Sequence, residues 1–138
     1  MRRRRVYLPL SGGDLEALAG PDQSLAPTSG YAVTRRLERA HPQADEEALE
    51  YAAFRAAASE AARRLAGAPT RRVVGAADLD SDAVAEADDP GDPGQVRLRA
   101  PVPLRALVSL HVDEAPGSDD ALQWYDITEL QSVRARCG

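Results

Sequence analysis

The sequence predicts an α+β domain in which a mixed sheet of four to six strands carries one long helix and shorter helices packed on it. Two neighbouring segments support this prediction. Residues 45–65, DEEALEYAAFRAAASEAARRL, repeat apolar residues at helical spacing. Residues 71–79, RRVVGAADL, form a short apolar run typical of a strand that is buried on both faces. Since 138 residues is the length of one domain, we expect residues 1–138 to fold around a single core.

The segments before the long helix predict a strand followed by short helices. Residues 4–10 alternate apolar and polar side chains, as a strand with one buried face does. Ser11 precedes a helical segment that runs to Ala19, and its hydroxyl is suited to cap that helix. The other elements expected here are a polar loop at 20–31, a brief strand at 31–33 and a helical turn at 35–40 capped by Thr34.

The long helix is expected to pack one apolar stripe on the sheet. The stripe consists of Tyr51, Phe54, Ala58, Ala61, Ala62 and Leu65. Leu49, Ala53 and Ala56 lie on the opposite side, which we expect to be exposed. Acidic residues in the first turns and arginines in the last complement the helix dipole. Gly67 and Pro69 are expected to end the helix.

The segments after the long helix predict further strands and a closing helix. The additional strands are expected at 96–102, 105–113 and 122–125. Residues 78–94 have the composition of an acidic, solvated loop. Asp126 and Glu129 have the spacing of a capping box for the closing helix. Trp124 is the largest side chain of an alanine-rich protein, and we expect it to anchor the core.

Composition and charge indicate the cellular compartment in which the protein works. The net charge is −5, and every one of the 17 basic residues is arginine. A single cysteine, Cys137, excludes an intramolecular disulfide framework. No apolar run approaches the roughly 20 residues of a membrane span. The start, MRRRRVYLPLSGGD, has too short an apolar run for a signal peptide. We therefore expect a cytoplasmic protein without a membrane partner.

Several segments resemble a known family. They are RVYLPL near the start, DEEALEYAAFRAA in the long helix, RRVVGAADL after it and LQWYDITEL near the end. As a set they resemble a family of small actinobacterial proteins catalogued only as a domain of unknown function, over residues 5–130. The resemblance implies a single-domain cytoplasmic protein, and it brings no catalytic residues with it.

The acidic segment contains carboxylates at the spacing of a calcium-binding loop. Counted from Asp78, the acids that match this spacing are Asp80, Asp82, Glu86 and Asp89. However, Ala83 stands where such a loop needs glycine, and the last position is an aspartate rather than a longer glutamate. We therefore favour a solvated loop in which Asp80 or Asp82 caps a short turn.

His111 and Asp113 form the second candidate pair. Two residues apart on a strand, they share a face and are spaced to bind a metal or to form a histidine–carboxylate pair. Two ligands do not complete a metal site, and the only other histidine, His41, precedes a proline. Nucleophilic catalysis lacks support, since no serine has a G-x-S-x-G setting. Ser11-Gly12-Gly13 forms a turn with the potential to hold an anion. No cofactor is expected.

A run of arginines from Arg2 to Arg5 raises the question of nucleic-acid binding. Arg71, Arg72, Arg97, Arg99 and Arg105 lie on other predicted strands. A nucleic-acid-binding protein is usually strongly basic, whereas this chain is acidic overall and poor in aromatic residues. These features disfavour nucleic acid as a partner.

These observations favour a non-enzymatic protein-interaction or regulatory module that binds an unidentified protein or a second copy of itself. The enzymatic alternative is a metal- or carboxylate-dependent hydrolase that uses His111 and Asp113. A nucleic-acid accessory protein is the second alternative.

Overall fold

A computed structural model describes residues 2–26, 29–65, 71–88, 91–116 and 121–137. The helices are α1 (Gly12–Ala19), α2 (Arg35–Ala40), α3 (Glu46–Leu65) and α4 (Leu130–Cys137), with 3₁₀ turns η1 (Ser81–Ala83), η2 (Leu104–Ala106) and η3 (Ile127–Glu129). The strands are β1 (Arg3–Leu10), β2 (Ser24–Leu25), β3 (Ser29–Tyr31), β4 (Val73–Asp80), β5 (Val84–Glu86), β6 (Gln95–Leu98), β7 (Val102–Pro103), β8 (Leu107–Val112) and β9 (Gln123–Asp126).

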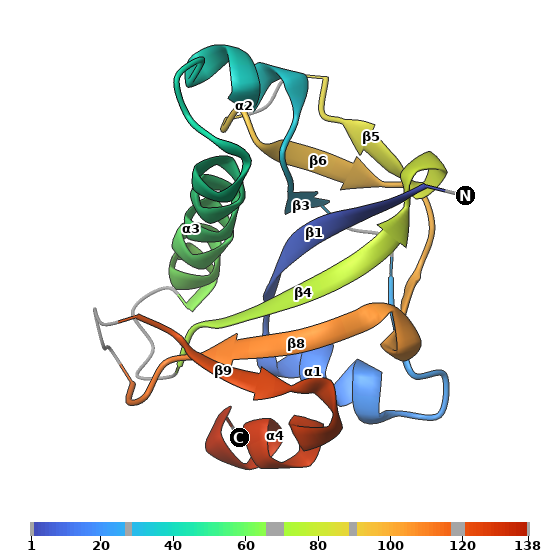
Figure 1. Cartoon of the computed structure of the whole chain (residues 1–138). Helices are drawn as coiled ribbons and strands as arrows, with labels where there is room; N and C mark the ends of the chain where they lie inside the picture. Colours follow the sequence, from blue (N-terminus) through green and yellow to red (C-terminus); the bar gives the residue numbers. More distant parts are fainter. Residues whose placement is uncertain (1, 27–28, 66–70, 89–90, 117–120, 138) are drawn as a thin grey trace.

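Seven strands form one sheet in the order β5-β6-β3-β1-β4-β8-β9 (Figure 1). Strands β2 and β7 form a separate two-stranded sheet. The α+β class is confirmed. The prediction of a mixed sheet of four to six strands differs from the structure in two respects, because every pairing is antiparallel and the main sheet has seven strands. Strands of two or three residues, such as β3 and β5, are too short to show a periodicity in the sequence.

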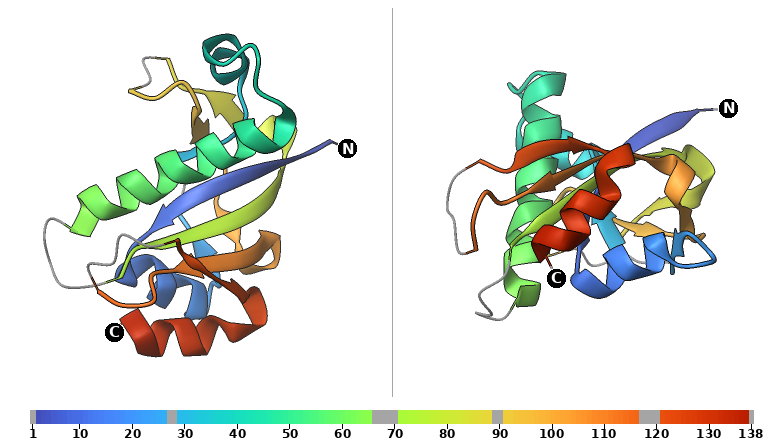
Figure 2. Two further views of the ribbon diagram at one scale, coloured as in Figure 1. Left: turned by 60° about the vertical axis from the view of Figure 1, so that its left-hand side comes forward. Right: turned by 90° about the horizontal axis from the view of Figure 1, so that it is seen from below.

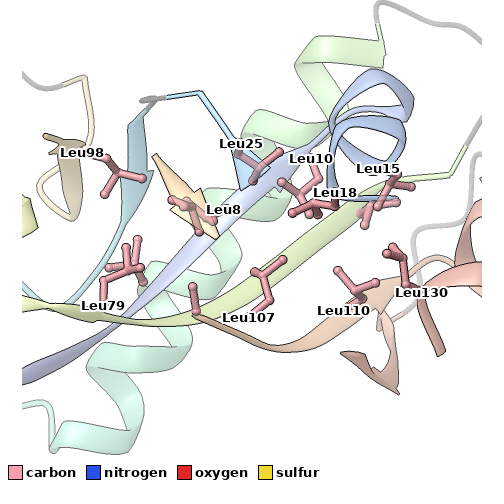
Figure 3. Packing of buried hydrophobic residues seen from close by; sticks show 14 of the residues in the cluster. Leu8, Leu10, Leu15, Leu18, Leu25, Leu79, Leu98, Leu107, Leu110 and Leu130 are labelled. Carbon is pink, nitrogen blue, oxygen red and sulfur yellow. The ribbon is translucent and has the colours of Figure 1, made fainter. Parts of the chain in front are cut away.

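Helices cover both faces of the main sheet (Figure 2). On one face, α3 packs over β1, β3 and β4. On the other face, α1 and α4 pack against each other and cover the larger core cluster. Figure 3 shows leucines of this cluster, which come from β1, β4 and β8 as well as from α1 and α4. The two central strands, β1 and β4, are therefore enclosed from both sides.

Several caps predicted from the sequence are confirmed. Ser11 accepts a hydrogen bond from the backbone N–H of Asp14, and the Asp14 carboxylate accepts one from the Ser11 N–H. Thr34 caps α2 through the N–H of Leu37. Of the capping box predicted with Asp126 and Glu129, only the Asp126 cap is confirmed, since Asp126 accepts from the N–H of Thr128 at the start of η3, which leads into α4. Gly67 and Pro69, which were expected to end α3, lie outside the described residues.

The face assignment of α3 was half wrong. The buried residues of α3 are Leu49, Ala53, Ala57, Ala58 and Ala61. Tyr51, expected to be buried, is 61% exposed, and Ala62 is exposed as well. Phe54 and Leu65 are half-buried at the flank of the helix. An alanine-rich helix has no clearly apolar face in its sequence. The structure places the small side chains against the sheet, where they allow the helix to approach it closely.

Trp124 is also placed differently from the prediction, since its side chain is 61% exposed. It lies on β9, the edge strand of the sheet, opposite His111 of β8. Its neighbour Tyr125 points to the other face and packs against the core cluster beneath α4. Only one of two adjacent strand residues can face that core. At this edge the core-facing residue is the tyrosine.

The corrected helix face predicts the cost of shortening its side chains. Leu49→Ala removes a buried side chain and should lower the free energy of unfolding by about 2–4 kcal/mol. Tyr51→Ala removes an exposed side chain and should change it by less than about 0.5 kcal/mol. Urea denaturation of the two variants measures both values. Equal losses in the two variants would contradict the helix orientation.

Gly30 is predicted to be required for the contact between β3 and β1. A Cβ atom at this position would lie 2.8 Å from Val6 Cγ1, 2.9 Å from Leu8 Cδ2 and 3.1 Å from the Tyr7 carbonyl oxygen. Gly30→Ala should therefore destabilise the protein by about 1–3 kcal/mol. Gly12→Ala is the control, because a Cβ there has no neighbour within 4 Å and alanine favours the helix. Thermal unfolding measures the stability of both variants. If Gly30→Ala were as stable as Gly12→Ala, the contact would be contradicted.

Candidate functional site

A broad concave surface lies beside the N-terminal half of β1. It encloses about 1170 Å³ and is open to solvent on one side. Its basic lining residues are Arg2, Arg3, Arg4, Arg5, Arg35, Arg97 and Arg99. Its acidic lining residues are Glu38, Glu46, Glu50, Asp78, Glu86 and Asp88. We refer to this surface as the arginine concavity.

The arginine concavity exists because the sheet opens beside β1. Strand β1 pairs with β4 along its whole length, from Arg3 opposite Asp80 to Leu10 opposite Val73. On its other side β1 meets β3 at a single position, Tyr7 opposite Tyr31. Beyond Tyr31 the chain leaves the sheet to begin α2, and η1 leads from the end of β4 to β5 at the far edge (Figure 1). In the described part of the chain, the N-terminal half of β1 therefore has no neighbouring strand on that side.

Two arginines of β1 are held by neighbouring groups. The Arg5 guanidinium forms a salt bridge with Asp78 at 2.6 Å, and this hydrogen bond raises the pKa of Arg5. The Arg4 guanidinium donates to the carbonyl oxygen of Val33 at 2.9 Å. These contacts hold β1 to β4 and to the segment after β3, so both arginines serve as structural supports of the site.

The remaining arginines are less constrained. Arg97 lies 3.6 Å from Asp88 in an exposed ion pair, which contributes little to stability. Arg99 reaches the carbonyl oxygen of Asp82 at 3.5 Å. Within the described ranges, the guanidinium groups of Arg2, Arg3 and Arg35 have neither an ion pair nor a side-chain hydrogen bond. These three positive charges are available to a ligand.

The acidic segment predicted as a loop at 78–94 contains regular structure in its described residues. The end of β4, η1 and β5 all fall within it, and Val84 is buried against β6. Asp80 accepts a hydrogen bond from the N–H of Asp82 at 3.1 Å, as expected of a turn cap. Short-range periodicity does not reveal such a strand, because β5 has only three residues.

The carboxylates described in this segment have separate partners. Asp78 binds Arg5, Asp80 caps η1, and Glu86 accepts from the N–H of Arg35. Asp89, the last position of the calcium-like spacing, lies outside the described residues. Among those described, no three His, Cys, Asp or Glu side chains are grouped so that they could hold a metal ion.

His111 and Asp113 have separate partners. The Asp113 carboxylate is 3% exposed and accepts hydrogen bonds from the N–H, Nε and Nη2 of Arg72. His111 Nε2 lies 3.0 Å from the Ser109 hydroxyl, and its ring stands edge-on to Phe54. Burial lowers the pKa of His111, with a smaller contribution from the positive charge of Arg5. Asp113 therefore supports the fold through Arg72, whereas His111 contacts Ser109 and Phe54.

The structure also explains the possible anion site at Ser11-Gly12-Gly13 and the state of the single cysteine. The turn at Ser11-Gly12-Gly13 carries its own anion, since the Asp14 carboxylate occupies the helix N-terminus through the capping box. Cys137 is half-buried, and burial raises the pKa of its thiol, which disfavours the reactive thiolate. None of the helices in the described residues is both long enough and apolar enough to cross a membrane.

The arginine concavity was only partly visible in the sequence. The run Arg2–Arg5 was a signal, as were Arg97 and Arg99. Arg35 was missed, because it belongs to a short helix whose position beside β5 depends on the tertiary fold.

Comparison with known proteins yields one match. A family of unknown function, DUF6912, matches residues 4–121. No curated protein and no solved structure matches the chain.

The surroundings of His111 predict a pH-dependent contribution to stability. Because burial lowers the pKa of His111, the folded state prefers the neutral ring. The contribution of the neutral ring to the free energy of unfolding is complete above the unfolded pKa of about 6.5. It is lost as the pH falls below that value towards the folded pKa. His111→Gln removes the titrating ring.

The difference in unfolding free energy between wild type and His111→Gln should therefore be larger at pH 7.5 than at pH 5. Urea denaturation at the two pH values measures it, and the comparison cancels the carboxylates common to both proteins. A difference independent of pH would show that His111 is not held in its neutral form.

Proposed function

We propose that this chain, which belongs to the DUF6912 family of unknown function, is a non-enzymatic interaction module that binds an acidic segment of another protein in the arginine concavity. The observation that carries the proposal is that three arginines, Arg2, Arg3 and Arg35, line one concave surface and that their guanidinium groups have no carboxylate partner among the described residues. Arginine is well suited to this role, because its planar group binds carboxylates through two parallel hydrogen bonds.

The acids that also line the arginine concavity favour a polypeptide over a nucleic acid. Six carboxylates stand beside seven arginines, so the lining offers sites for both charges. A nucleic-acid backbone carries one negative charge per phosphate, so the six acids and the net charge of −5 repel it more strongly than a peptide whose carboxylates alternate with neutral residues. The lining contains no aromatic side chain on which a base could stack. A peptide with spaced carboxylates fits this mixed pattern better.

The hydrolase alternative finds less support. Asp113 is neutralised by Arg72, and His111 is directed to Ser109. A general base needs a free position from which to accept a substrate proton. Within the described residues, neither side chain lines the arginine concavity.

Binding to a defined acidic peptide tests the proposal. The probe is a fluorescein-labelled peptide of eight residues in which Glu and Val alternate. We expect saturable binding at low salt, and weakening as added salt screens the exposed charges. Arg3→Ala combined with Arg35→Ala should weaken binding roughly tenfold, since each exposed ion pair contributes about 0.2–1 kcal/mol.

The matched control removes two arginines that do not line the arginine concavity, through Arg39→Ala combined with Arg105→Ala. This variant has the same net charge as the first and should bind the peptide as the wild type does. Equal weakening in the two variants would show that net charge alone attracts the peptide. Tighter binding of a single-stranded octanucleotide than of the peptide would favour the nucleic-acid alternative.

A further inference from the structure

The backbone of β1 has an unpaired edge inside the arginine concavity. In an antiparallel ladder, the N–H and C=O groups of successive residues point alternately to the two sides of the strand. The Ser81 N–H donates to the Arg2 carbonyl oxygen at 2.9 Å, so the backbone of Arg2 is directed to the β4 side. The alternation then directs Arg4 and Val6 towards β4, and Arg3 and Arg5 away from it.

Two other residues of β1 agree with this assignment. Tyr7 belongs to the set directed away from β4, and it is the residue of β1 that pairs with β3. Pro9 belongs to the same set and has no N–H. Because its backbone is directed away from β4, no hydrogen bond to β4 is lost. The Pro9 carbonyl oxygen instead accepts a hydrogen bond from Arg64 of α3.

Among the residues that the structure describes, no strand covers the edge at Arg3 and Arg5. The residue that would stand opposite Arg5 if β3 continued is Val33, but the chain turns there towards α2. The Val33 carbonyl oxygen is bound by the Arg4 side chain rather than by the β1 backbone. Across the described residues, the N–H and C=O groups of Arg3 and Arg5 have no backbone partner. The concave surface thus combines free ladder groups with free arginine side chains.

We propose that the acidic segment binds as an added β-strand, by pairing its backbone with Arg3 and Arg5 of β1 while its carboxylates bind the arginines of the concavity. This inference rests on the proposed function and specifies its binding mode. An added strand would lie about 4.8 Å from β1, in the place that β3 vacates. Backbone pairing would supply affinity, and the alternate side chains would supply selectivity for acidic sequences.

Amide hydrogen exchange gives a direct test with the Glu–Val octapeptide. In the free protein, the N–H groups of Arg3 and Arg5 should exchange fast, and that of Arg4 should be protected by β4. Saturation with the peptide should slow exchange at Arg3 and Arg5 at least tenfold and leave Arg4 unchanged. The amides of β9, the edge strand on the opposite side of the sheet, serve as an internal control and should not change.

Backbone methylation of the peptide provides the second test. One version carries N-methyl groups on every valine and another carries them on every glutamate, so that each loses the N–H groups along one edge but keeps its charge. At least one version should bind tenfold or more weakly than the parent peptide, because several ladder hydrogen bonds are lost.

The outcomes separate the two proposals. Absence of saturable binding by the parent peptide would overturn both of them. Binding that depends on Arg3 and Arg35, with fast exchange at Arg3 and Arg5 and with both methylated peptides within twofold of the parent, would overturn strand addition alone. Protection of β9 in place of β1 would also overturn strand addition at the arginine concavity.

Discussion

The pairing of β1 with β4 is the interaction on which the rest of the structure depends. These two strands pair over eight consecutive positions at the centre of the sheet. Their residues on one face enter the larger core with α1 and α4, and Val74 on the other face enters the smaller core with α3. Small residues make this double burial feasible. Gly75, Ala76 and Ala77 in β4 and the alanines of α3 leave room for helices to approach the sheet.

The same strand supplies both the core and the candidate site because its character changes along its length. From Val6 to Leu10 the alternation of β1 places aliphatic side chains in the core. From Arg3 to Arg5 every side chain is an arginine, and burial of these residues between two layers would be costly without partners. The sheet opens where the arginines begin. Arg5 is balanced by Asp78 and Arg4 by a carbonyl oxygen, and the other charges are left to solvent or to a ligand.

An ion pair between the buried Asp113 and Arg72 lies at the opposite end of β4. Asp113 follows β8 and is almost fully buried, where the carboxylate accepts hydrogen bonds from the backbone and side chain of Arg72. A buried carboxylate requires such partners. The pair joins the segment before β4 to the end of β8. For this reason, an aspartate that resembles a metal ligand in the sequence has a structural role in the fold.

The sequence by itself determined the α+β class, the long helix, the central strands and the helix caps, because each rests on local periodicity or on a side chain that bonds its own backbone. Ser11 and Thr34 are examples. Only the tertiary structure decided which face of α3 is buried and that Trp124 is exposed. An alanine-rich helix has almost no preferred face, and a strand does not reveal whether it lies at an edge. The arginine concavity was determined at both levels. Arg2–Arg5 were evident in the sequence, whereas Arg35, Arg97 and Arg99 join them because strands and turns distant in the chain meet where β1 loses its neighbour.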